Sequence, residues 1–451
     1  MTAPSPLAGL VRLAKVSAAA RLPFAFARVS GKVAAITPSG ITVAGLSPWL
    51  KLGDLVSLAT HGDAVLAEVI RLEAGEALVK PLAQQEEVAL GAAAVPLGPL
   101  HFRPHASWKG RLLNALGEPA DGGPPLPQGT EAVTLSQEAP AAMSRGVISE
   151  KVTTGVRVVD VFTPLCFGQR IGIFAGSGVG KSTLLAMLSR ASGFDMVVIA
   201  LVGERGREVR EFVEKVLGDA ARNAILVVAT GDESPMMRKL APQLATAIAE
   251  YFRDQGQKVL LIMDSVTRYA HACRDIAMAA GEPPVARGFP PSVFSSLPGL
   301  LERAGPGPEG QGSITGIYAV LVDGDDHNDP VADTIRGTLD GHIVLSRAIG
   351  EQGRYPAVDV QASLSRLAPI AWTASERAAA NDLRRLVARY EDSRDLRALG
   401  GYQPGQDEEL DRALLLVPRL YGALIQPGDA PPSVDAFADM AEALKRAPAK
   451  G

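Results

Sequence analysis

IGIFAGSGVGKSTLLAM, residues 171–187, is the stretch from which the fold can be derived. The apolar run Ile171–Phe174 predicts a buried strand, and the apolar spacing after Lys181 predicts a helix. The turn between them carries three glycines, so successive backbone N–H groups can point into one concavity at the positive end of the helix dipole. Strand, glycine-rich turn and helix in this order predict a phosphate-binding loop.

The positions within the loop predict separate roles. Lys181 can reach the β- and γ-phosphates of a nucleotide, and the Ser182 hydroxyl can ligate Mg²⁺. Ala175 stands where the usual pattern opens with glycine, and its small side chain is compatible with the turn. We expect nucleotide binding by the whole loop, which consists of Ala175, Gly176, Ser177, Gly178, Val179, Gly180, Lys181, Ser182 and Thr183.

Two carboxylates follow apolar runs elsewhere in the chain. Asp264 ends the predicted strand VLLIMD (259–264), a position from which a carboxylate holds magnesium through water. Glu204 comes just after the apolar run Met196–Val202, where a base can orient water on a γ-phosphate. Considered alone, Asp264 could be a simple strand-end carboxylate and Glu204 a helix N-terminal acid. The phosphate-binding loop in the same chain favours the functional interpretation of both.

Composition limits the class of protein. The chain has 451 residues and a formal net charge of −4, which suits two or three domains and gives no sign of nucleic-acid binding by bulk charge. No apolar run is long enough to cross a membrane, and the N-terminus lacks the apolar segment of a secretory signal. The two cysteines, Cys166 and Cys273, lack metal-ligand neighbours, so we expect reduced thiols in a cytoplasmic protein.

The N-terminal part of the chain predicts two units. Residues 1–20 carry an amphipathic helix that is too short to stand alone and must dock on its own domain, a partner or a membrane surface. Residues 21–98 contain short alternating stretches separated by turns, which predict a small antiparallel β-barrel. The barrel segment has only Phe24, Phe26 and Trp49 as aromatic residues, so we expect a ring-forming module that binds no nucleic acid.

The rest of the chain predicts an α/β fold, a RecA-like P-loop NTPase core over residues 99–368 with a parallel sheet, followed by a helical domain over 369–451. Residues 281–298 and 305–312 are dense in glycine and proline and are predicted to be long loops. The predicted strands of the core are 171–175, 196–202, 224–229, 259–263, 317–322 and 342–346.

Four further motifs occur in a fixed order: GERGREV (203–209), LLIMDSVTRYA (260–270), LSRAIGEQGRYPAVD (345–359) and SLSRLAP (363–369). With the phosphate-binding loop, they resemble the rotary ATPase family of the ATP synthase α and β subunits. Within that family, the stretches WKGRLLNALGEPADG (108–122) and GYQPGQDEELDRA (401–413) resemble the flagellar type III protein export ATPases. The resemblance extends from about residue 24 to near residue 430 and implies Mg²⁺ and ATP as ligands.

The resemblance also implies roles for matching positions. Glu204 matches the catalytic glutamate, and Arg205 matches an arginine that reaches the γ-phosphate. Glu208 and Arg268 match residues that order the magnesium and γ-phosphate shell. Tyr355 matches a tyrosine that stacks on adenine, for which its planar face is suited. Arg366 matches an arginine finger given to the neighbouring subunit's site; a surface salt bridge is the alternative.

The same resemblance implies a homohexameric ring with sites at the subunit interfaces. The C-terminal helices would meet a central stalk protein, and the N-terminal helix would bind a regulatory, stator-like protein. Export substrates and their chaperones would be further partners. The ring would lie in the cytoplasm in peripheral contact with the inner-membrane export gate.

Three other functions compete with ATP-driven flagellar export. A virulence type III secretion ATPase is the nearest alternative. A non-catalytic ring subunit typically has glutamine at the position of Glu204, so this sequence favours catalysis. A hexameric nucleic-acid motor shares the core but needs a basic groove with aromatic residues.

Overall fold

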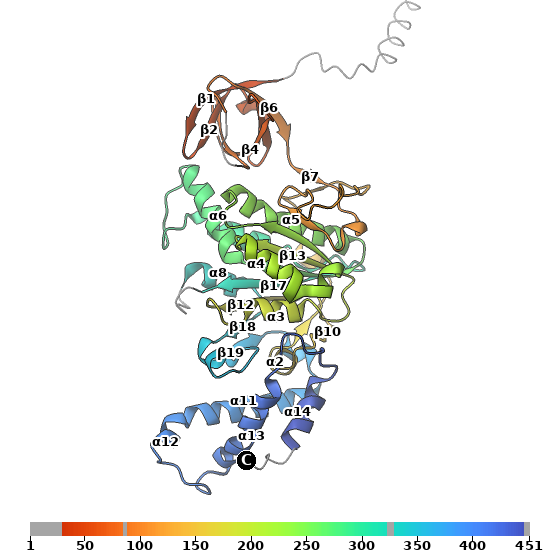
Figure 1. The fold of residues 1–451 in the computed structure, drawn as a ribbon, viewed down its shortest axis with the longest axis vertical. Coiled ribbons are helices and arrows are strands. Elements are labelled where there is room, and N and C mark those ends of the chain that lie inside the picture. Colours follow the sequence, from red (N-terminus) through yellow and green to blue (C-terminus); the bar gives the residue numbers. More distant parts are fainter. Residues whose placement is uncertain (1–28, 84–87, 323–328, 446–451) are drawn as a thin grey trace, which may run out of the picture.

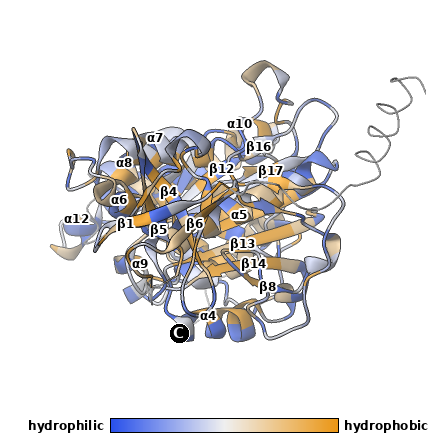
Figure 2. Ribbon diagram, turned by 90° about the horizontal axis from the view of Figure 1, so that it is seen from above, coloured by the Kyte–Doolittle hydropathy of each residue, from blue (hydrophilic) through white to orange (hydrophobic). Residues whose placement is uncertain are grey.

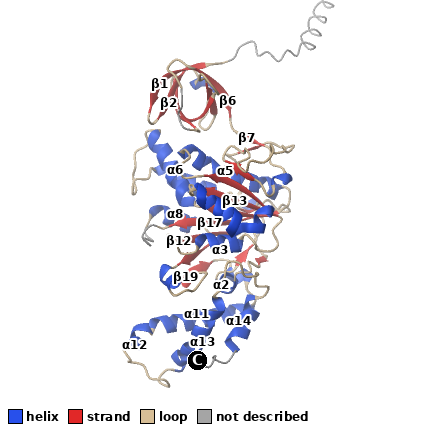
Figure 3. Ribbon diagram, in the orientation of Figure 1, coloured by secondary structure: helices blue, strands red, loops and turns tan. Residues whose placement is uncertain are grey.

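The computed structural model describes residues 29–83, 88–322 and 329–445. Three regions follow one another along the long axis of the molecule: a barrel, an α/β body and a bundle of helices (Figure 1). The barrel consists mainly of strands and the C-terminal region of helices (Figure 3). The predicted fold class is therefore confirmed, whereas the predicted helix of residues 1–20, together with Phe24 and Phe26, lies outside the described residues.

The barrel closes in the order β1-β2-β5-β4-β3-β6, with antiparallel pairing throughout. β1 begins with alternating buried and exposed side chains, as a half-buried strand requires, whereas β4 is buried at three consecutive residues, 67–69. Five of the strands fall on alternating stretches that the sequence predicts, at residues 32–37, 41–43, 55–58, 65–72 and 77–82. The sixth, β6, closes the barrel against β1. The strands are β1 (Gly31–Thr37), β2 (Gly40–Ala44), β3 (Leu55–Leu58), β4 (Val65–Glu73), β5 (Glu76–Pro81) and β6 (Ala93–Gly98), with the 3-10 turn η1 (Ser47–Trp49) between β2 and β3.

A segment with little regular structure joins the barrel to the body. Its strand β8 adds parallel to β14 at the edge of the central sheet, so this segment contributes to the sheet as well as connecting the domains. The elements are β7 (His101–Phe102), η2 (Ala106–Trp108), β8 (Leu112–Asn114), β9 (Val133–Thr134), η3 (Ala142–Ser144), β10 (Lys151–Val152), α2 (Arg157–Phe162) and β11 (Leu165–Cys166).

The central sheet has the order β19-β18-β12-β17-β15-β13-β14-β8. Seven of these strands are parallel and the edge strand β19 is antiparallel to β18. The inner strands are continuous apolar runs, as expected for a sheet covered on both faces (Figure 2). The strands are β12 (Arg170–Ala175), β13 (Met196–Val202), β14 (Ala224–Ala229), β15 (Lys258–Asp264), β17 (Ser313–Leu321), β18 (Gly341–Leu345) and β19 (Val358–Ser365), with the short β16 (Gly305–Pro306) beside β17.

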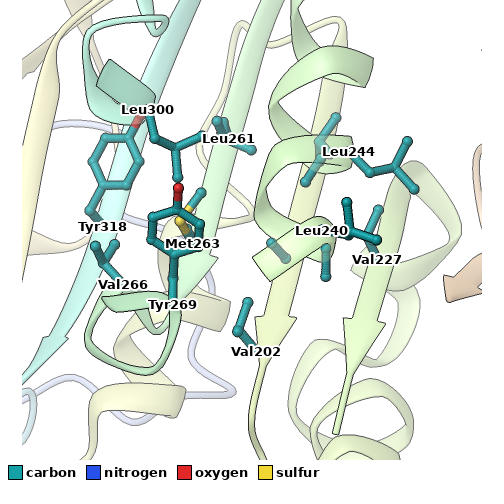
Figure 4. Packing of buried hydrophobic residues seen from close by; sticks show 14 of the residues in the cluster. Val202, Val227, Leu240, Leu244, Leu261, Met263, Val266, Tyr269, Leu300 and Tyr318 are labelled. Atoms are coloured by element: carbon teal, nitrogen blue, oxygen red, sulfur yellow. The ribbon is translucent and has the colours of Figure 1, made fainter. Parts of the chain in front are cut away.

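Helices cover the sheet and close its core. Leu240 and Leu244 of α5 point toward Val202 and Val227 on the adjoining strands (Figure 4). Tyr269 and Leu300, which come from two further helices, belong to the same buried cluster and pack over other strands of the sheet. The helices are α3 (Lys181–Leu188), α4 (Gly206–Glu211) with its π-helical continuation η4 (Phe212–Leu217), η5 (Gly218–Asn223), α5 (Pro235–Asp254), α6 (Val266–Ala279), α7 (Pro291–Leu301), α8 (Pro330–Thr338) and α9 (Arg347–Glu351).

The predicted loop over residues 281–298 is wrong in its second half, where α7 begins. Pro291 occupies the first turn, where a missing N–H costs nothing, and Pro298 lies inside the helix near its end. Val293 and Leu297 are buried on the body and hold the helix in place. Tertiary packing has therefore overridden the local composition.

The C-terminal region is helical, as predicted. Its first long helical stretch is divided into two helices at Ser393, whose N–H still bonds the carbonyl of Arg389. The helices are α10 (Ala368–Ala371), α11 (Ala374–Asp392), α12 (Arg394–Ala398), α13 (Glu408–Leu424) and α14 (Ala436–Lys445). Across the described residues, none of the helices combines the length and apolar character that spanning a bilayer requires.

A buried ion pair joins α5 to the end of α7. Arg303 donates to both carboxylate oxygens of Glu250 at 2.9 and 2.5 Å and to the carbonyl of Leu135 at 2.7 Å. Removing one partner leaves the other charge buried and unpaired. We therefore expect Glu250→Gln to lower the free energy of unfolding by about 3 kcal/mol or more. Denaturant titration measures this, with Asp219→Asn of the exposed pair Asp219–Arg222 as the near-neutral control.

Candidate functional site

The phosphate-binding loop lies where β12 passes into α3. Gly178 and Gly180 have φ of 78° and 91°, a region that side chains other than glycine rarely adopt. Gly180 is the N-cap of α3, so Lys181 begins the helix at the positive end of its dipole. Ser182 and Thr183 are exposed at this first turn. Two hydroxyl-bearing residues thus lie at the exposed start of α3.

Lys181 lies between two acidic side chains. Its ammonium forms an ion pair with Asp264 and lies 3.8 Å from Oε1 of Glu204. Asp264 is the last residue of β15, and Glu204 comes two residues after the end of β13. Because β15 and β13 are adjacent parallel strands, their carboxyl ends bring both acids to the same edge of the sheet. The structure therefore joins three of the predicted site residues.

Glu204 is held in place by its surroundings. Arg268, on α6, approaches Oε2 of Glu204 at 3.5 Å and also donates to the carbonyl of Gly203. Burial raises the pKa of the Glu204 carboxyl above its ordinary value. Asp264 adds to this rise, whereas the cations of Lys181 and Arg268 oppose it. A carboxylate in this setting accepts a proton more readily than one in water.

A cavity of about 210 Å³ lies beside these groups. Four predicted residues, Ser182, Glu204, Glu208 and Asp264, contribute to its wall. Within the described part of the chain, no group of three or more His, Cys, Asp or Glu side chains forms a ready-made metal cage. One hydroxyl with a few carboxylates nevertheless fits Mg²⁺, which typically takes one or two protein oxygens and completes its shell with substrate phosphates and water. The rest of the wall consists of Leu201, Val209, Glu211, Phe212 and Val216.

Tyr355 lies against the phosphate-binding loop. A Cβ built on Gly180 would be 3.3 Å from its ring, and one built on Gly350 would be 3.2 Å from its hydroxyl. The tyrosine is 44% exposed, so part of its ring is free to stack on a planar ligand. The structure thus places this predicted residue at the loop although it is 175 positions further along the chain.

None of the three predicted arginines lines the cavity, although Arg268 contacts Glu204 in its wall. Arg205 is exposed, and its guanidinium lies 3.3 Å from Glu208 at the cavity wall. Arg366 follows the edge strand β19, and its backbone N–H bonds the carbonyl of Asp340. Among the described residues, the exposed guanidinium of Arg366 has no hydrogen bond or ion pair. It is therefore free to contact another molecule.

Sequence reasoning missed several residues at the site. Arg347, on α9, donates to the carbonyl of Ser177 at 3.4 Å, and Phe212 of η4 forms part of the cavity wall. Gln426, after α13, bonds the carbonyl of Tyr355 at 2.8 Å. A π-helical segment such as η4 often marks a functional site, but no sequence signal reveals it. The contact between Gln426 and the loop that carries Tyr355 could not be predicted without knowledge of the fold.

Two known protein families match separate parts of the chain, the α/β body and the C-terminal helical region. Residues 155–365 match the nucleotide-binding domain of the ATP synthase alpha/beta family, and residues 372–445 match the C-terminal domain of the type III secretion ATPase EscN. The "Flagellum-specific ATP synthase" of Agrobacterium fabrum is 54% identical over 415 residues, which cover 92% of this chain and 88% of that protein. The "Type 3 secretion system ATPase" of Xanthomonas euvesicatoria is 44% identical over 420 residues, 90% of this chain and 91% of that protein.

Solved structures agree with these relatives. The assembled ATPase EscN from the type III secretion system of enteropathogenic E. coli superimposes with a TM-score of 0.84 at 40% identity, covering 92% of this chain and 98% of that one. EscN in complex with its central stalk EscO gives a TM-score of 0.83 over the same shares. The protein is thus a nucleotide-binding ATPase, and the chain belongs to the ATP synthase alpha/beta family and, within it, to the flagellum-specific ATP synthases.

Proposed function

We propose that this protein forms a ring that hydrolyses Mg²⁺-ATP and couples hydrolysis to the export of flagellar proteins. The observation that carries this proposal is the single cavity beside Lys181 that Ser182, Glu204, Glu208 and Asp264 share. The names of the relatives support flagellar export, and the identity of 54% against 44% favours it over virulence secretion.

The ammonium of Lys181 is proposed to bind the phosphates. In the structure it is shared between Asp264 and Glu204, both of which are acidic. Oxygens of the β- and γ-phosphates are stronger competitors for this cation, because they carry more charge and lie over the positive end of α3. On nucleotide binding, Lys181 would therefore leave Glu204 free to contact water.

Glu204 is proposed to be the general base. Its carboxylate accepts a hydrogen bond from water and takes the proton as the water oxygen bonds to the γ-phosphorus, while the bond to the ADP oxygen breaks. The proton then passes from Glu204 to solvent. Arg268 keeps the carboxylate oriented through its contact at 3.5 Å, and Arg205 is close enough to Glu208 to join the γ-phosphate shell.

The donor set around the cavity also supports Mg²⁺ as cofactor. Ser182 would supply its hydroxyl, Asp264 would act through water and Glu208 would order the outer shell. When bound, the ion supplies positive charge that stabilises the phosphoryl group during transfer.

Removal of the Ser182 hydroxyl tests the magnesium site. We expect Ser182→Ala to raise the Mg²⁺ concentration needed for half-maximal hydrolysis roughly 10-fold to 100-fold, because one ligand is lost. Ser295→Ala removes an exposed hydroxyl from α7, outside the nucleotide-binding loop, and serves as the control. A titration of phosphate release against Mg²⁺ in which both variants match the unmodified protein would contradict the assignment.

The proposed assembly is a homohexamer with Tyr355 stacked on adenine and Arg366 acting on the neighbouring subunit's nucleotide. The exposed guanidinium of Arg366 and the assembled form of EscN support this arrangement. A central stalk protein is proposed to contact the C-terminal helices, since EscN is known with its stalk EscO. Leu396 and Leu399 on and after α12 are exposed apolar residues that such a partner could cover.

The remaining partners follow from the family and are part of the same proposal. Residues 1–20 would bind a regulatory, stator-like protein, and the ring would receive export substrates and chaperones. It would work in the cytoplasm, touching the inner-membrane export gate peripherally, and would bind no nucleic acid. Deletion of residues 1–20 is expected to keep ATP hydrolysis and to weaken binding of the regulatory partner, as measured by co-sedimentation.

Phosphate release from Mg²⁺-ATP by the purified protein tests the function. We expect hydrolysis that rises when the stalk protein from the same organism is added and that does not respond to single-stranded RNA. Stimulation by RNA alone would instead identify a nucleic-acid motor. Absence of any hydrolysis across protein concentrations that permit ring formation would overturn the proposal.

A further inference from the structure

The segment that follows α13, residues 425–428, lies against the nucleotide site. The backbone N–H of Gln426 donates to the carbonyl of Tyr355 at 2.8 Å. The carbonyl of Gly428 accepts a hydrogen bond from Arg190, just past the end of α3. A Cβ on Gly428 would lie 2.5 Å from the Thr183 side chain. A piece of the C-terminal region is therefore packed between Tyr355 and the phosphate-binding helix.

Gln426 uses its whole side-chain amide to connect this segment to the body. It is 3% exposed. Its Nε2 donates to the carbonyl of Gly155 at 2.9 Å, and its Oε1 accepts from the N–H of Arg157 at 3.1 Å. Both partners lie at the start of α2. Glutamine is suited to this position because it carries one donor group and one acceptor.

The turn that receives Gln426 is itself firmly held. The carboxylate of Asp160 accepts from the N–H of Thr154 at 3.0 Å, its hydroxyl at 2.8 Å, and the N–H of Gly155 at 3.0 Å. Arg157 returns a hydrogen bond to the carbonyl of Ile425 at 2.8 Å. Gln426 is thus fixed at one end to a rigid turn and at the other to the loop that carries Tyr355.

We infer that Gln426 is a positioning residue that sets Tyr355 for the nucleobase by joining its loop to the start of α2. The inference rests on the proposed function, in which Tyr355 stacks on adenine. Within the part of the chain that the structure describes, Gln426 makes no hydrogen bond to Lys181, Glu204 or Asp264. Its loss should therefore weaken binding of the base and leave the phosphate side unchanged.

Gln426→Glu is the sharpest test, because it keeps size and shape while replacing the donor by an oxygen that faces the Gly155 carbonyl. We expect the Kd for ADP, measured by calorimetry, to rise roughly 10-fold, as for the loss of a buried hydrogen bond beside a charge. The Kd for inorganic tripolyphosphate, which has no base, should stay within about twofold. Gln403→Glu, on the exposed side of the C-terminal domain, makes the same charge change and should alter neither value.

Two further variants keep the test decisive. Gln426→Met removes both hydrogen bonds without adding charge, and it replaces Gln426→Glu if the latter does not fold. Tyr355→Ala should weaken ADP binding as well, and the double variant should lose less than the sum of the single losses, because Gln426 acts through Tyr355.

The outcomes separate the inference from the proposed function. Suppose that the unmodified protein binds ADP and that the variant folds. An unchanged Kd for ADP, or an equal loss of affinity for ADP and for tripolyphosphate, then overturns the positioning role alone. Failure of the unmodified protein to bind ADP overturns the proposed function and with it this inference.

Discussion

Glu204→Gln is expected to lower turnover of Mg²⁺-ATP by roughly 10²-fold to 10⁴-fold while nucleotide still binds. Glutamine keeps the size of the side chain and its contact with Arg268, but it cannot take a proton. Burial raises the pKa of the Glu204 carboxyl, which makes it a stronger base than a carboxylate in water. Its loss should therefore have a large effect. Steady-state phosphate release gives the rate, and equilibrium titration with a fluorescent nucleotide gives the affinity.

The control is Glu214→Gln, which removes a carboxylate from the neighbouring helical turn. Glu214 is exposed and paired with Arg210 at 2.8 Å, outside the cavity wall. Its substitution should leave turnover within about twofold, since exposed pairs contribute little. If Glu204→Gln loses nucleotide affinity but retains the rate per bound site, Glu204 has a structural role and another base must be sought.

Arg366→Ala is expected to lower turnover by roughly 10³-fold or more, because an arginine that neutralises charge on the transferring phosphoryl group is lost. The guanidinium of Arg366 is exposed, and in the described chain it has no partner. We therefore expect it to act on the neighbouring subunit. In the unmodified protein, activity should rise cooperatively as increasing protein concentration drives ring formation, and Arg366→Ala should flatten this rise.

Mixed rings test the action between subunits. Arg366→Ala and Glu204→Gln subunits should each be nearly inactive alone. In a mixture, some interfaces combine an intact Glu204 with an intact Arg366 from the next subunit, so partial activity should return. Arg222→Ala, on the exposed η5 turn, is the control for loss of a surface arginine. Absence of recovery in mixtures shown by mass measurement to co-assemble would count against action in trans.

The sequence was sufficient for the main strands of the body. The predicted bounds of β13 and β14 coincide with those of the structure, β12 begins one residue earlier than predicted, and β15 is one residue longer at each end. Strands buried on both faces are uniformly apolar, so local composition identifies them. The phosphate-binding loop was equally readable, because glycine is required where the backbone takes positive φ.

Local composition failed where packing decided the conformation. Residues 291–301 form a helix despite their prolines, because Val293 and Leu297 are buried against the body. The strands β6 and β8 also went unpredicted. β8 has only three residues, too few to show a periodicity, and β6 contains Pro96 and Gly98, which are unusual in strands. The division into four domains, with boundaries after residues 20, 98 and 368, remains a prediction.

The sequence alone predicts a nucleotide-binding loop over residues 175–183, and it places Asp264 at the end of one strand and Glu204 just after the end of another. Only the tertiary structure decided that these acids meet Lys181, because the order β12-β17-β15-β13 separates the strands in the sheet while aligning their carboxyl ends. It also decided that Gln426 would meet Tyr355 and Gly155. Contacts between residues so far apart in the chain depend on how whole elements pack, and no local pattern encodes them.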